Sequence, residues 1–421
     1  MKKFFKQTLL LLNKFFFPFY KDKEIKILFY NLEKNESFEK EGAMFVGGCV
    51  RNFLQSKKIV DIDIATIFTP LEIKKKLKNT NFKVIDTGID HGSVTVILND
   101  KKFELTTLRK DIKTDGRHAE VKLINDWEED SKRRDFTINA IYLNKRGKIF
   151  DPQQGVNDLK NGVVKFIGDP QTRIEEDFLR IIRFVRFSMQ YNSLIEQSTV
   201  NAIKLNLNGI KKISKERVLL EIFKILKLPN FFKINENKQI KEIFSIIFPE
   251  FINLNRLKNF EIIKGCIKSS ELLFLSILLI DLKSNYEYFC HKYKISNKIK
   301  EELSLLGANF KIFNKDKEFF KKKLKSNLYY LGANNMKILY SLNLLNKKKF
   351  SKKEIELFKF IDNLSIPQFP YDGKTLIKKG FMEGKKIGKI LDEAEKFWIQ
   401  NDFNISSDEF EKIVKNNSSL N

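Results

Sequence analysis

The chain has 421 residues, too many for a single hydrophobic core, and its 42% of hydrophobic residues predicts two or more globular domains. Lysine and arginine outnumber aspartate and glutamate by 78 to 53, and the net charge of +25 favours a polyanionic partner, although abundant Lys, Asn, Ile and Phe also fit an A/T-rich genome. The three scattered cysteines argue against a disulfide scaffold or a zinc site and fit a reducing, cytoplasmic compartment.

The N-terminal residues 1–20 start with two lysines and contain the apolar run Leu9–Leu12. Lys6 and Lys14 interrupt the apolar character, and no small-residue cleavage site follows. The segment therefore predicts an amphipathic helix packed on the first domain rather than a signal peptide. No other apolar segment approaches the roughly 18 residues of a membrane span, so we expect no membrane partner.

A glycine pair follows the apolar run Met44–Val46 and precedes a single arginine. Gly47 and Gly48 allow a backbone to approach a phosphate with bare N–H groups, because no side chain stands in the way. Arg51 offers a bidentate positive charge for the same phosphates. The stretch therefore predicts a phosphate-binding turn.

The next apolar run, Val60–Ala65, is predicted to be a β-strand. Side chains alternate between the faces of a strand, so Asp61 and Asp63 would share one face while Val60 points into a core. Two such carboxylates repel each other unless a cation lies between them, and hard oxygen ligands suit Mg²⁺. A D-x-D pair alone could also be a solvated strand edge, but the upstream glycines and arginine favour a metal site.

A helix is predicted over Pro70–Lys78, and a β-hairpin over Ser93–Leu98 and Phe103–Leu108. Glu104 lies on the second strand of this hairpin. It could stand beside the aspartates as a third carboxylate, or it could be an ordinary surface residue. The polar stretch from Thr107 to Asp130 predicts a long mobile loop.

Basic residues run directly into the apolar stretch Asp135–Ala140, part of a predicted strand over Thr137–Leu143. Arg134 could hold a triphosphate, and Asp135 could accept a hydrogen bond from a ribose hydroxyl. Taken alone, the stretch could equally be a charged cap. A turn at Asp151–Gly155 and a short hairpin ending near Gly168 are predicted next.

A single long helix is predicted from about Thr172 to Met189, with apolar residues nearly all round. Arg180, Arg183 and Arg186 recur at intervals of three residues, with Asp177 one turn before the first. Buried arginines need partners. These could be internal acidic groups such as Glu175, Glu176 and Asp177, or the base edge and phosphates of a nucleotide.

From about Gly209 onward the patterns are helical, with Ser214 as a helix cap. Residues 366–373 predict a linker. Gly380, Gly384 and Gly388 then punctuate a lysine-rich stretch that suits RNA phosphates, followed by a helix that contains Trp398.

Four sequence blocks resemble the class II tRNA nucleotidyltransferase and bacterial poly(A) polymerase family, within the polymerase-β-like nucleotidyltransferase superfamily. They are Gly47-Gly48…Arg51…Asp61-Ile62-Asp63, Arg133–Ala140, Asp151-Pro152…Gly155…Asp158-Leu159 and Glu176–Phe187. The blocks lie in the family's order between about 45 and 190, and the match is weak beyond 230. Asn52 departs from the Asp of many members, whereas His91–Val96 is similar to the CCA-adding branch.

The resemblance implies an α+β fold in which a polymerase-β-like nucleotidyltransferase head with a mixed sheet precedes an all-α neck, body and tail. The expected boundaries are 1–155 for the head, 156–230 for the neck, 231–365 for the body and 366–421 for a basic, RNA-binding tail.

The resemblance also implies roles for individual residues. Asp61 and Asp63 are similar to the Mg²⁺ ligands. Glu104, from its place on the hairpin and not from the resemblance, is predicted as a third catalytic carboxylate. Nucleotide-binding positions are matched by Gly48, Arg51, Arg134, Asp135, Asp177, Arg180, Arg183 and Arg186. Asp135 would contact the ribose, and Asp177 with Arg180 would read the base edge.

The implied activity is template-independent addition or repair of the 3′-terminal CCA of tRNA from CTP and ATP, by two-metal phosphoryl transfer. The implied partner is the 3′ end and acceptor arm of tRNA. A poly(A) polymerase with the same site and a non-catalytic RNA-binding protein are the alternatives, the second giving no reason for both Asp61 and Asp63.

Overall fold

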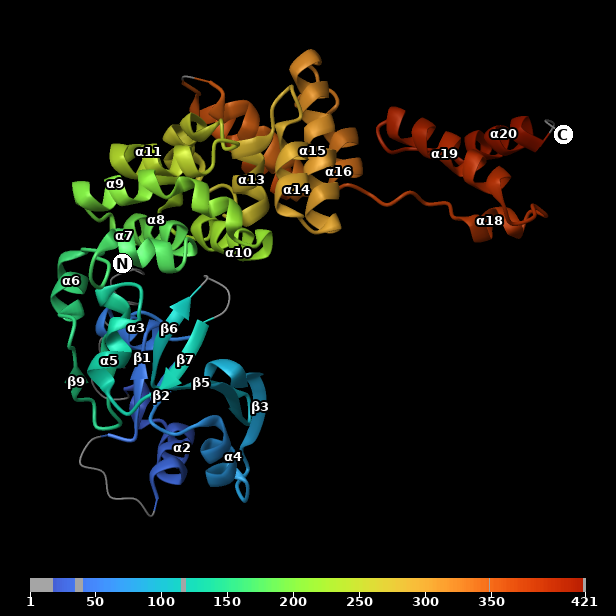
Figure 1. Ribbon diagram of the computed structural model, residues 1–421. Coiled ribbons are helices and arrows are strands. Elements are labelled where there is room, and N and C mark those ends of the chain that lie inside the picture. Colours follow the sequence, from blue (N-terminus) through green and yellow to red (C-terminus); the bar gives the residue numbers. More distant parts are fainter. Residues whose placement is uncertain (1–17, 35–40, 115–118, 348, 419–421) are drawn as a thin grey trace. The chain divides into compact units, whose positions relative to one another are not determined.

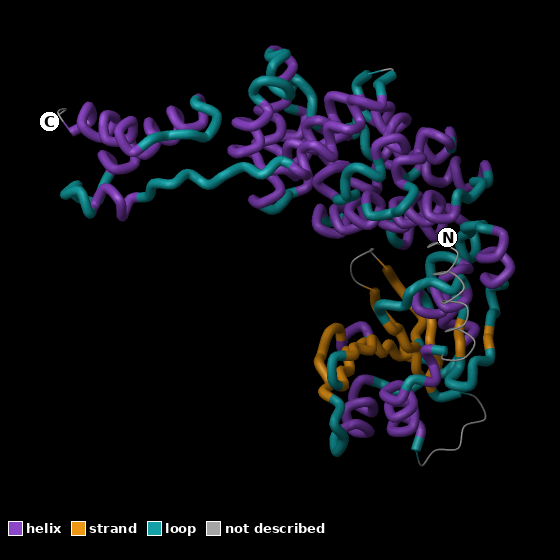
Figure 2. Tube along the Cα trace, turned by 180° about the vertical axis from the view of Figure 1, so that it is seen from behind, coloured by secondary structure: helices purple, strands orange, loops and turns teal. Residues whose placement is uncertain are grey.

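The computed structural model describes residues 18–34, 41–114, 119–347 and 349–418, and Figure 1 follows the helices and strands along the chain. The chain divides into two compact units, Met1–Pro249 and Glu250–Asn421. The strands lie in the first unit (Figure 2), and the described part of the second unit is helical. The predicted α+β class is therefore confirmed. Most of the helix predicted over residues 1–20 lies outside the described residues.

Among the described residues, seven strands form one mixed sheet in the order β3-β4-β5-β2-β1-β8-β9. Their bounds are β1 Ala43–Val46, β2 Ile62–Thr66, β3 Lys83–Gly88, β4 Ser93–Leu98, β5 Lys101–Thr107, β8 Tyr142–Leu143 and β9 Ile149–Phe150. β2 and β5 run parallel, and the other neighbouring strands run antiparallel. The predicted hairpin is the β4–β5 pair, closed at Asn99, whose φ is 53°.

Short helices pack beside this sheet. They are α2 Lys23–Glu33, α3 Gly48–Leu54 and α4 Pro70–Leu77, and α3 contacts both β1 and β2. The predicted helix over Pro70–Lys78 is confirmed by α4. It starts with a capping box, in which the side chains of Thr69 and Glu72 each accept a hydrogen bond from the other residue's backbone N–H. A core of Met44, Val46, Ala65, Leu108, Trp127 and Tyr142 lies against the sheet.

The strand that carries the aspartates begins later than predicted. β2 starts at Ile62, so Asp61 precedes the strand. The side chain of Val60 is 75% exposed, so the prediction that it points into the core was wrong. Since regular alternation begins only at Ile62, it does not apply to Val60.

Residues 107–130 do not form the predicted long loop. They contain the two-stranded hairpin of β6 Arg109–Thr114 and β7 Ala119–Leu123, followed by α5 Trp127–Lys132. Polar strands satisfy their backbone by pairing with each other, although their side chains give little apolar alternation. Asp126 caps α5 by accepting from two backbone N–H groups.

Two other predictions in the head were wrong or too long. The strand predicted over Thr137–Leu143 is a 3₁₀ turn, η3 Thr137–Asn139, followed by the two-residue strand β8. The hairpin predicted after Gly155 is instead the helix α6 Gly155–Asn161. Gly155 must be glycine at this point, because a Cβ there would lie 2.1 Å from the carbonyl oxygen of Thr137.

The single helix predicted over 172–189 is two helices, α7 Pro170–Glu176 and α8 Leu179–Tyr191. The break falls at Asp177, whose φ of −154° and ψ of 104° are extended. The rest of the first unit is helical, with α9 Gln197–Leu205, η4 Leu207–Lys212, α10 Lys215–Leu226, η5 Phe231–Glu236 and α11 Lys238–Ile247. Ser214 caps α10 as predicted.

In the second unit the helices are η6 Leu254–Asn259, α12 Phe260–Ile263, α13 Glu271–Leu279, α14 Asn285–Tyr293, α15 Asn297–Lys315, α16 Leu324–Leu345 and α17 Lys352–Asn363. α13 is apolar on nearly every side and is buried almost throughout. Within the described residues, no helix combines the length and apolar character needed to cross a membrane.

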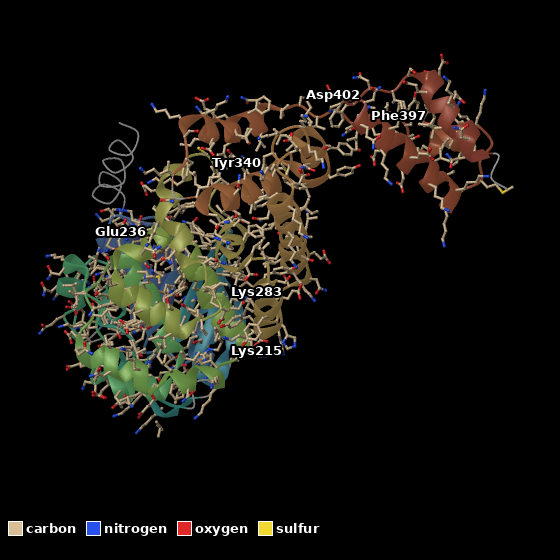
Figure 3. All side chains as sticks on the ribbon, turned by 90° about the horizontal axis from the view of Figure 1, so that it is seen from above. Lys215, Glu236, Lys283, Tyr340, Phe397 and Asp402 are labelled. Atoms are coloured by element: carbon tan, nitrogen blue, oxygen red, sulfur yellow. The ribbon has the colours of Figure 1, made fainter. Side chains whose placement is uncertain are left out.

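The predicted linker, residues 366–373, is largely without helix or strand. The tail helices after it are α18 Gly373–Ile377, α19 Lys385–Gln400 and α20 Ser407–Ser418. Gly388 lies inside α19 and does not interrupt it, contrary to expectation. The Trp398 ring lies edge-on to Tyr329 of α16, and Lys325 pairs with Asp402, labelled in Figure 3. The tail therefore contacts its own unit.

Candidate active site

A cavity of about 690 Å³ opens in the first unit beside β2, α7 and α8, and we call it the nucleotide cavity. Among its described lining residues, eight are basic: Arg51, Arg109, Arg133, Arg134, Arg180, Arg183, Arg186 and Lys224. Five are acidic: Asp63, Asp111, Asp135, Glu176 and Asp177. The excess of positive charge suits a phosphate-rich anion. Seven arginines in one cavity also offer the fork geometry that binds phosphate oxygens in pairs.

Asp63 reaches this cavity from β2, next to the glycine pair. The backbone N–H of Gly48 bonds the Asp63 carboxylate, and a Cβ on Gly47 would lie 3.4 Å from Asp63 Oδ2. Gly47 has a φ of 73°, a conformation that side chains rarely adopt. The glycines therefore allow the turn to approach the carboxylate closely, and both of them line the cavity.

Glu104 lies directly beside Asp63, because the parallel register of β2 and β5 places these two residues opposite each other. The hydroxyl of Thr95 bonds both Glu104 carboxylate oxygens, at 2.8 and 2.9 Å. Of the two alternatives that the sequence left open for Glu104, the position beside the aspartate strand is therefore the one observed. Asp61, Asp63 and Glu104 together line a second cavity, and Asp63 lines the nucleotide cavity as well.

The carboxylates fit a bound cation. Burial raises the pKa of Asp63, Asp61 and Glu104 raise it further, and Arg134 lowers it. Arg134 forms its ion pair with Asp130 rather than with Asp63. The described residues contain no complete site of three or more metal-binding side chains. Two carboxylates still suffice for Mg²⁺, whose other ligands are usually substrate phosphates and water.

Arg51 is held at the cavity wall. Its Nη1 donates to Asn139 Oδ1, and its guanidinium lies 4.8 Å from the centre of the Phe187 ring. The Nε of Arg51 is buried and has no hydrogen-bond partner among the described residues. Asn52, where many members of the family have Asp, donates to the carbonyl of Lys58 at 3.1 Å and so keeps a local bond.

Arg134 is positioned by a buried carboxylate that the sequence did not indicate. Asp130 is fully buried and accepts bonds from Arg134 at 3.0 Å, Arg133 at 2.7 Å and the Tyr142 hydroxyl at 2.7 Å. Burial opposes ionisation, but Arg134 and Arg133 outweigh it and lower the pKa of Asp130 to about 2. Both arginines are therefore kept pointing along the cavity edge.

The Asp135 side chain forms hydrogen bonds with other side chains of the protein. Its carboxylate accepts from Arg183 Nη2 at 2.5 Å, Arg183 Nε at 2.8 Å and Asn139 Nδ2 at 2.8 Å. Against the effect of burial, Arg183 and then Asn139 lower the pKa of Asp135 to about 2. Both residues line the nucleotide cavity.

Arg186 is the last of the three regularly spaced arginines of α8, and it forms an ion pair with Glu221 of α10 at 2.7 Å. Its guanidinium also stacks 4.0 Å from the centre of the Phe187 ring. Glu221 is only 2% exposed and also accepts from Lys224 at 2.8 Å. An internal acidic network does exist, but it uses Asp135 and Glu221 besides Glu176.

Asp177 and Arg180 both line the nucleotide cavity, and the Arg180 backbone N–H bonds the Asp177 carbonyl, but their side chains bond other partners. Arg180 Nη1 bonds Glu176 at 2.5 Å and the carbonyl of Arg173 at 2.8 Å. Asp177 accepts from the backbone N–H of Leu179 at 3.0 Å and from Arg217 of α10 at 2.7 Å.

The cavity residues that were given no site role from the sequence are His91, Arg109, Asp111, Arg133, Asn139, Glu176, Phe187 and Lys224. Arg109 donates to the backbone carbonyl of His91. Arg133 and Asn139 stood inside the matched blocks and could have been found there. Arg109 lay in the stretch that was predicted to be a loop and carried no separate signal.

Two family models match the chain. Residues 43–165 match the model described as Poly A polymerase head domain, and residues 194–254 match that described as Probable RNA and SrmB- binding site of polymerase A. The first range contains both aspartates and the Arg134 block, and the second contains Arg217 and Glu221.

The chain is also similar to curated proteins over most of its length. CCA tRNA nucleotidyltransferase 1, mitochondrial, from Danio rerio is 32% identical over 388 residues, covering 86% of this chain and 84% of that protein. The protein of the same name from Homo sapiens is 30% identical, with coverage of 90% and 88%. The CCA-adding enzyme of Lactobacillus delbrueckii subsp. bulgaricus is 32% identical, with coverage of 85% and 90%.

Solved structures share the fold. The CCA-adding enzyme of Bacillus stearothermophilus in complex with CTP superposes with a TM-score of 0.70 at 23% identity, covering 93% of this chain and 96% of that one. The Thermotoga maritima CCA-adding enzyme complexed with a tRNA superposes with a TM-score of 0.63 at 21% identity, covering 97% and 98%.

Proposed function

Because this chain belongs to the CCA-adding tRNA nucleotidyltransferase family, we propose that it adds or repairs the 3′-terminal CCA of tRNA, using CTP and ATP. The observation that carries the proposal is the row of Asp61, Asp63 and Glu104 beside an arginine-rich cavity. Carboxylates that hold a cation and arginines that hold a triphosphate are the parts that phosphoryl transfer requires.

Nucleotidyltransferases of this family generally use a divalent metal, and we assign Mg²⁺ as the ion and Asp61 and Asp63 as its protein ligands. When bound, Mg²⁺ neutralises the developing charge on the phosphates and activates the attacking hydroxyl. The position of the Asp63 carboxylate, beside Glu104 and at the wall of the arginine-rich cavity, supports this assignment.

The protein contributes position and electrostatics to the reaction. Arg51 and Arg134 bind the triphosphate, and Gly48 allows it to lie close to the backbone. The RNA 3′ oxygen forms a bond to the α-phosphorus, the bond from that phosphorus to the pyrophosphate oxygen breaks, and pyrophosphate leaves. We assign Glu104 as the acceptor of the hydroxyl proton, since Thr95 holds it beside Asp63.

The base is read on α8 and the segment before it. Asp177 offers acceptors and Arg180 offers donors, which together match the edges of C and A. Asp135 is assigned to the ribose, and Arg183 and Arg186 support these groups from α8. In the structure these side chains bond protein partners, so nucleotide binding would exchange some of those bonds for bonds to the nucleotide.

We assign binding of the tRNA body to the basic parts of the chain, in particular the tail. We retain a head over 1–155, a neck over 156–230, a body over 231–365 and an RNA-binding tail over 366–421. Lys378, Lys385 and Lys389 of the tail are exposed, as phosphate contacts must be.

The proposed location is the cytoplasm. Cys49 and Cys290 are buried and all three cysteines are free thiols, which suits a reducing compartment. Relatives include bacterial enzymes and mitochondrial ones, so detection of the native protein in an organelle would contradict this assignment.

One experiment separates the candidate functions. The protein is incubated with Mg²⁺, a tRNA lacking its 3′ CCA, and labelled CTP or ATP. Incorporation of two C residues and one A supports the proposal. A long A tract from ATP alone would indicate a poly(A) polymerase, and binding without incorporation would indicate an RNA-binding protein.

A further inference from the structure

Arg173 of α7 is only 8% exposed and is not among the described residues that line the nucleotide cavity. Its guanidinium nevertheless bonds groups of three residues that do line it. Nη2 donates to the backbone carbonyls of Arg133 and Arg134, both at 2.7 Å, and Nη1 donates to the carboxylate of Glu176. A buried guanidinium needs partners for its N–H groups, and Arg173 finds its partners on two segments of the cavity wall.

The first contact fixes the main chain from which Arg134 extends. Arg133 and Arg134 follow α5, which ends at Lys132, so their carbonyls have no partner inside that helix. The Arg134 side chain is held separately, by Asp130. Arg173 therefore acts on the position of the backbone, whereas Asp130 acts on the direction of the side chain.

The second contact connects Arg173 to the arginine assigned to base reading. Glu176 Oε2 accepts from Arg173 Nη1 and also from Arg180 Nη1, the latter at 2.5 Å. Burial lowers the pKa of Arg173, Arg180 lowers it further, and Glu176 opposes both effects. The shared carboxylate thus allows two side chains of like charge to lie beside each other within the protein.

A further hydrogen bond closes a ring. Arg180 Nη2 donates to the carbonyl of Arg133 at 3.2 Å, and the same oxygen accepts from Arg173. From that oxygen the ring passes through Arg173, Glu176 and Arg180 and returns to it. The bonds of such a network depend on one another, so a displacement of Arg180 also disturbs the backbone that carries Arg134.

An arginine with a similar contact lies in the second unit. Arg256 Nη1 donates to the carbonyls of Ile277 and Ile280, at 2.9 and 2.7 Å, and its Nε donates to Asn346. These partners belong to the ends of α13 and α16, and none is among the described residues that line the nucleotide cavity. Arg173 makes the same contact with two carbonyls, but each of its three partners lines that cavity.

We propose that Arg173 is a positioning residue that couples reading of the base to placement of the triphosphate. The inference rests on the proposed function, because it takes Arg134 to bind the triphosphate and Arg180 to read the base. A base that bonds Arg180 correctly keeps the ring closed and the Arg134 backbone in place. A base that displaces Arg180 opens the ring, so the wrong nucleotide is also held poorly for transfer.

Steady-state kinetics with Arg173→Ala test the coupling. The ratio of kcat for CTP to kcat for UTP is expected to fall about tenfold, because a broken ring misplaces the triphosphate of either nucleotide. The ratio of the two KM values should stay within about twofold, since Asp177 and Arg180 still line the cavity. Arg173→Lys keeps the charge without the planar fork, so it should restore Tm more fully than it restores the kcat ratio.

A binding experiment gives a readout that needs neither RNA nor transfer. Inorganic triphosphate is titrated into the protein in Mg²⁺, and its Kd is expected to rise roughly tenfold in Arg173→Ala, because the Arg134 backbone is no longer preorganised. Arg256→Ala is the matched control, since it removes the same contact with two carbonyls. It should lower Tm without changing the Kd or the kcat ratio. Arg173→Lys replaces Arg173→Ala in both experiments if the alanine variant does not fold.

The possible outcomes are distinct. A lowered Tm in Arg173→Ala, with a kcat ratio or a triphosphate Kd equal to that of Arg256→Ala, would overturn the coupling and leave Arg173 as a structural contact. If the wild-type protein transfers no nucleotide, the proposed function fails, and the titration with inorganic triphosphate still decides whether Arg173 positions the Arg133–Arg134 segment.

Discussion

Asp177 and Arg217 form an ion pair in which Arg217 Nη2 donates to Asp177 Oδ2 across 2.7 Å. The two residues are 40 positions apart and come from the break between α7 and α8 and from the first turn of α10. Leu179 N–H bonds the other oxygen of the same carboxylate. The carboxylate assigned to base reading is therefore oriented by a neighbouring helix and by its own backbone.

Arg217→Ala should loosen Asp177 and reduce base selectivity while leaving catalysis measurable. Loss of a charge-assisted bond to a partly buried group costs roughly 1–3 kcal/mol, so we expect UTP incorporation relative to CTP to rise about tenfold or more. The measurement is the ratio of kcat/KM for CTP and UTP. Lys215→Ala, an exposed cation at the start of the same helix (Figure 3), is the control.

Arg217→Lys distinguishes positioning from general charge. Lysine keeps the charge but not the planar fork, so partial selectivity is expected. If Arg217→Ala remains as selective as the parent, the ion pair has no part in base choice.

Asp177→Ala should keep measurable catalysis but lose selectivity for CTP and ATP over UTP and GTP. C and A present an amino donor to this carboxylate, whereas U and G present a carbonyl acceptor, and each mismatched buried group costs roughly 1–3 kcal/mol. Single-nucleotide incorporation with all four triphosphates measures the change. If the variant rejects UTP as strictly as the wild type, the base-reading assignment is wrong, and Arg180, Arg183 and Arg186 of α8 have a structural role.

Asp61→Ala and Asp63→Ala should each abolish nucleotide addition in Mg²⁺ while the fold and tRNA binding persist. The physical reason is the loss of half of the carboxylate pair that holds the cation. Incorporation assays and a tRNA titration measure the two properties separately. Asp86→Ala, an exposed carboxylate on β3, is the control, and near-normal activity in either active-site variant would contradict the metal assignment.

Asp130→Asn should destabilise the first unit at neutral pH by roughly 3–5 kcal/mol, because Arg133 and Arg134 lose a buried partner. The folded pKa of about 2 lies below the ordinary value of 3.8, so the stabilisation is present above pH 3.8 and is lost as the pH falls toward 2. The difference in Tm between wild type and variant should therefore shrink over that range.

Asp126→Asn is the matched control for this prediction. It makes the same change on the same helix α5, at an exposed cap that asparagine also fills. An Asp130→Asn difference that stays constant between pH 5 and pH 2.5 would show that the ionised carboxylate is not what stabilises the arginines.

Replacing the exposed tail lysines Lys378, Lys385 and Lys389 with alanine should weaken tRNA binding and flatten its salt dependence. Each lost phosphate contact is expected to reduce the slope of log K against log salt by about 0.7–0.9. Binding is measured between low and high salt. These substitutions leave Trp398 packed on Tyr329, which deletion of the tail from Tyr371 would not. Unchanged affinity and slope would exclude the tail as an RNA-binding surface.

Short-range patterns in the sequence determined much of the head. The glycine pair, the apolar run around Asp63 and the alternation of the hairpin predicted β1, β2, β4 and β5, and hence that Glu104 could lie beside Asp63. Helical spacing likewise placed Arg180, Arg183 and Arg186 along one helix. These features depend on backbone geometry over a few residues, which local side chains dictate.

Only the tertiary structure decided the partners of those residues. The sequence did not indicate that Asp177 would break the helix and meet Arg217. It also did not indicate that Val60 would face a cavity. Local propensity sets an element, but the pairing of buried charges and the exposure of a side chain depend on segments 40 or more residues away that pack against it.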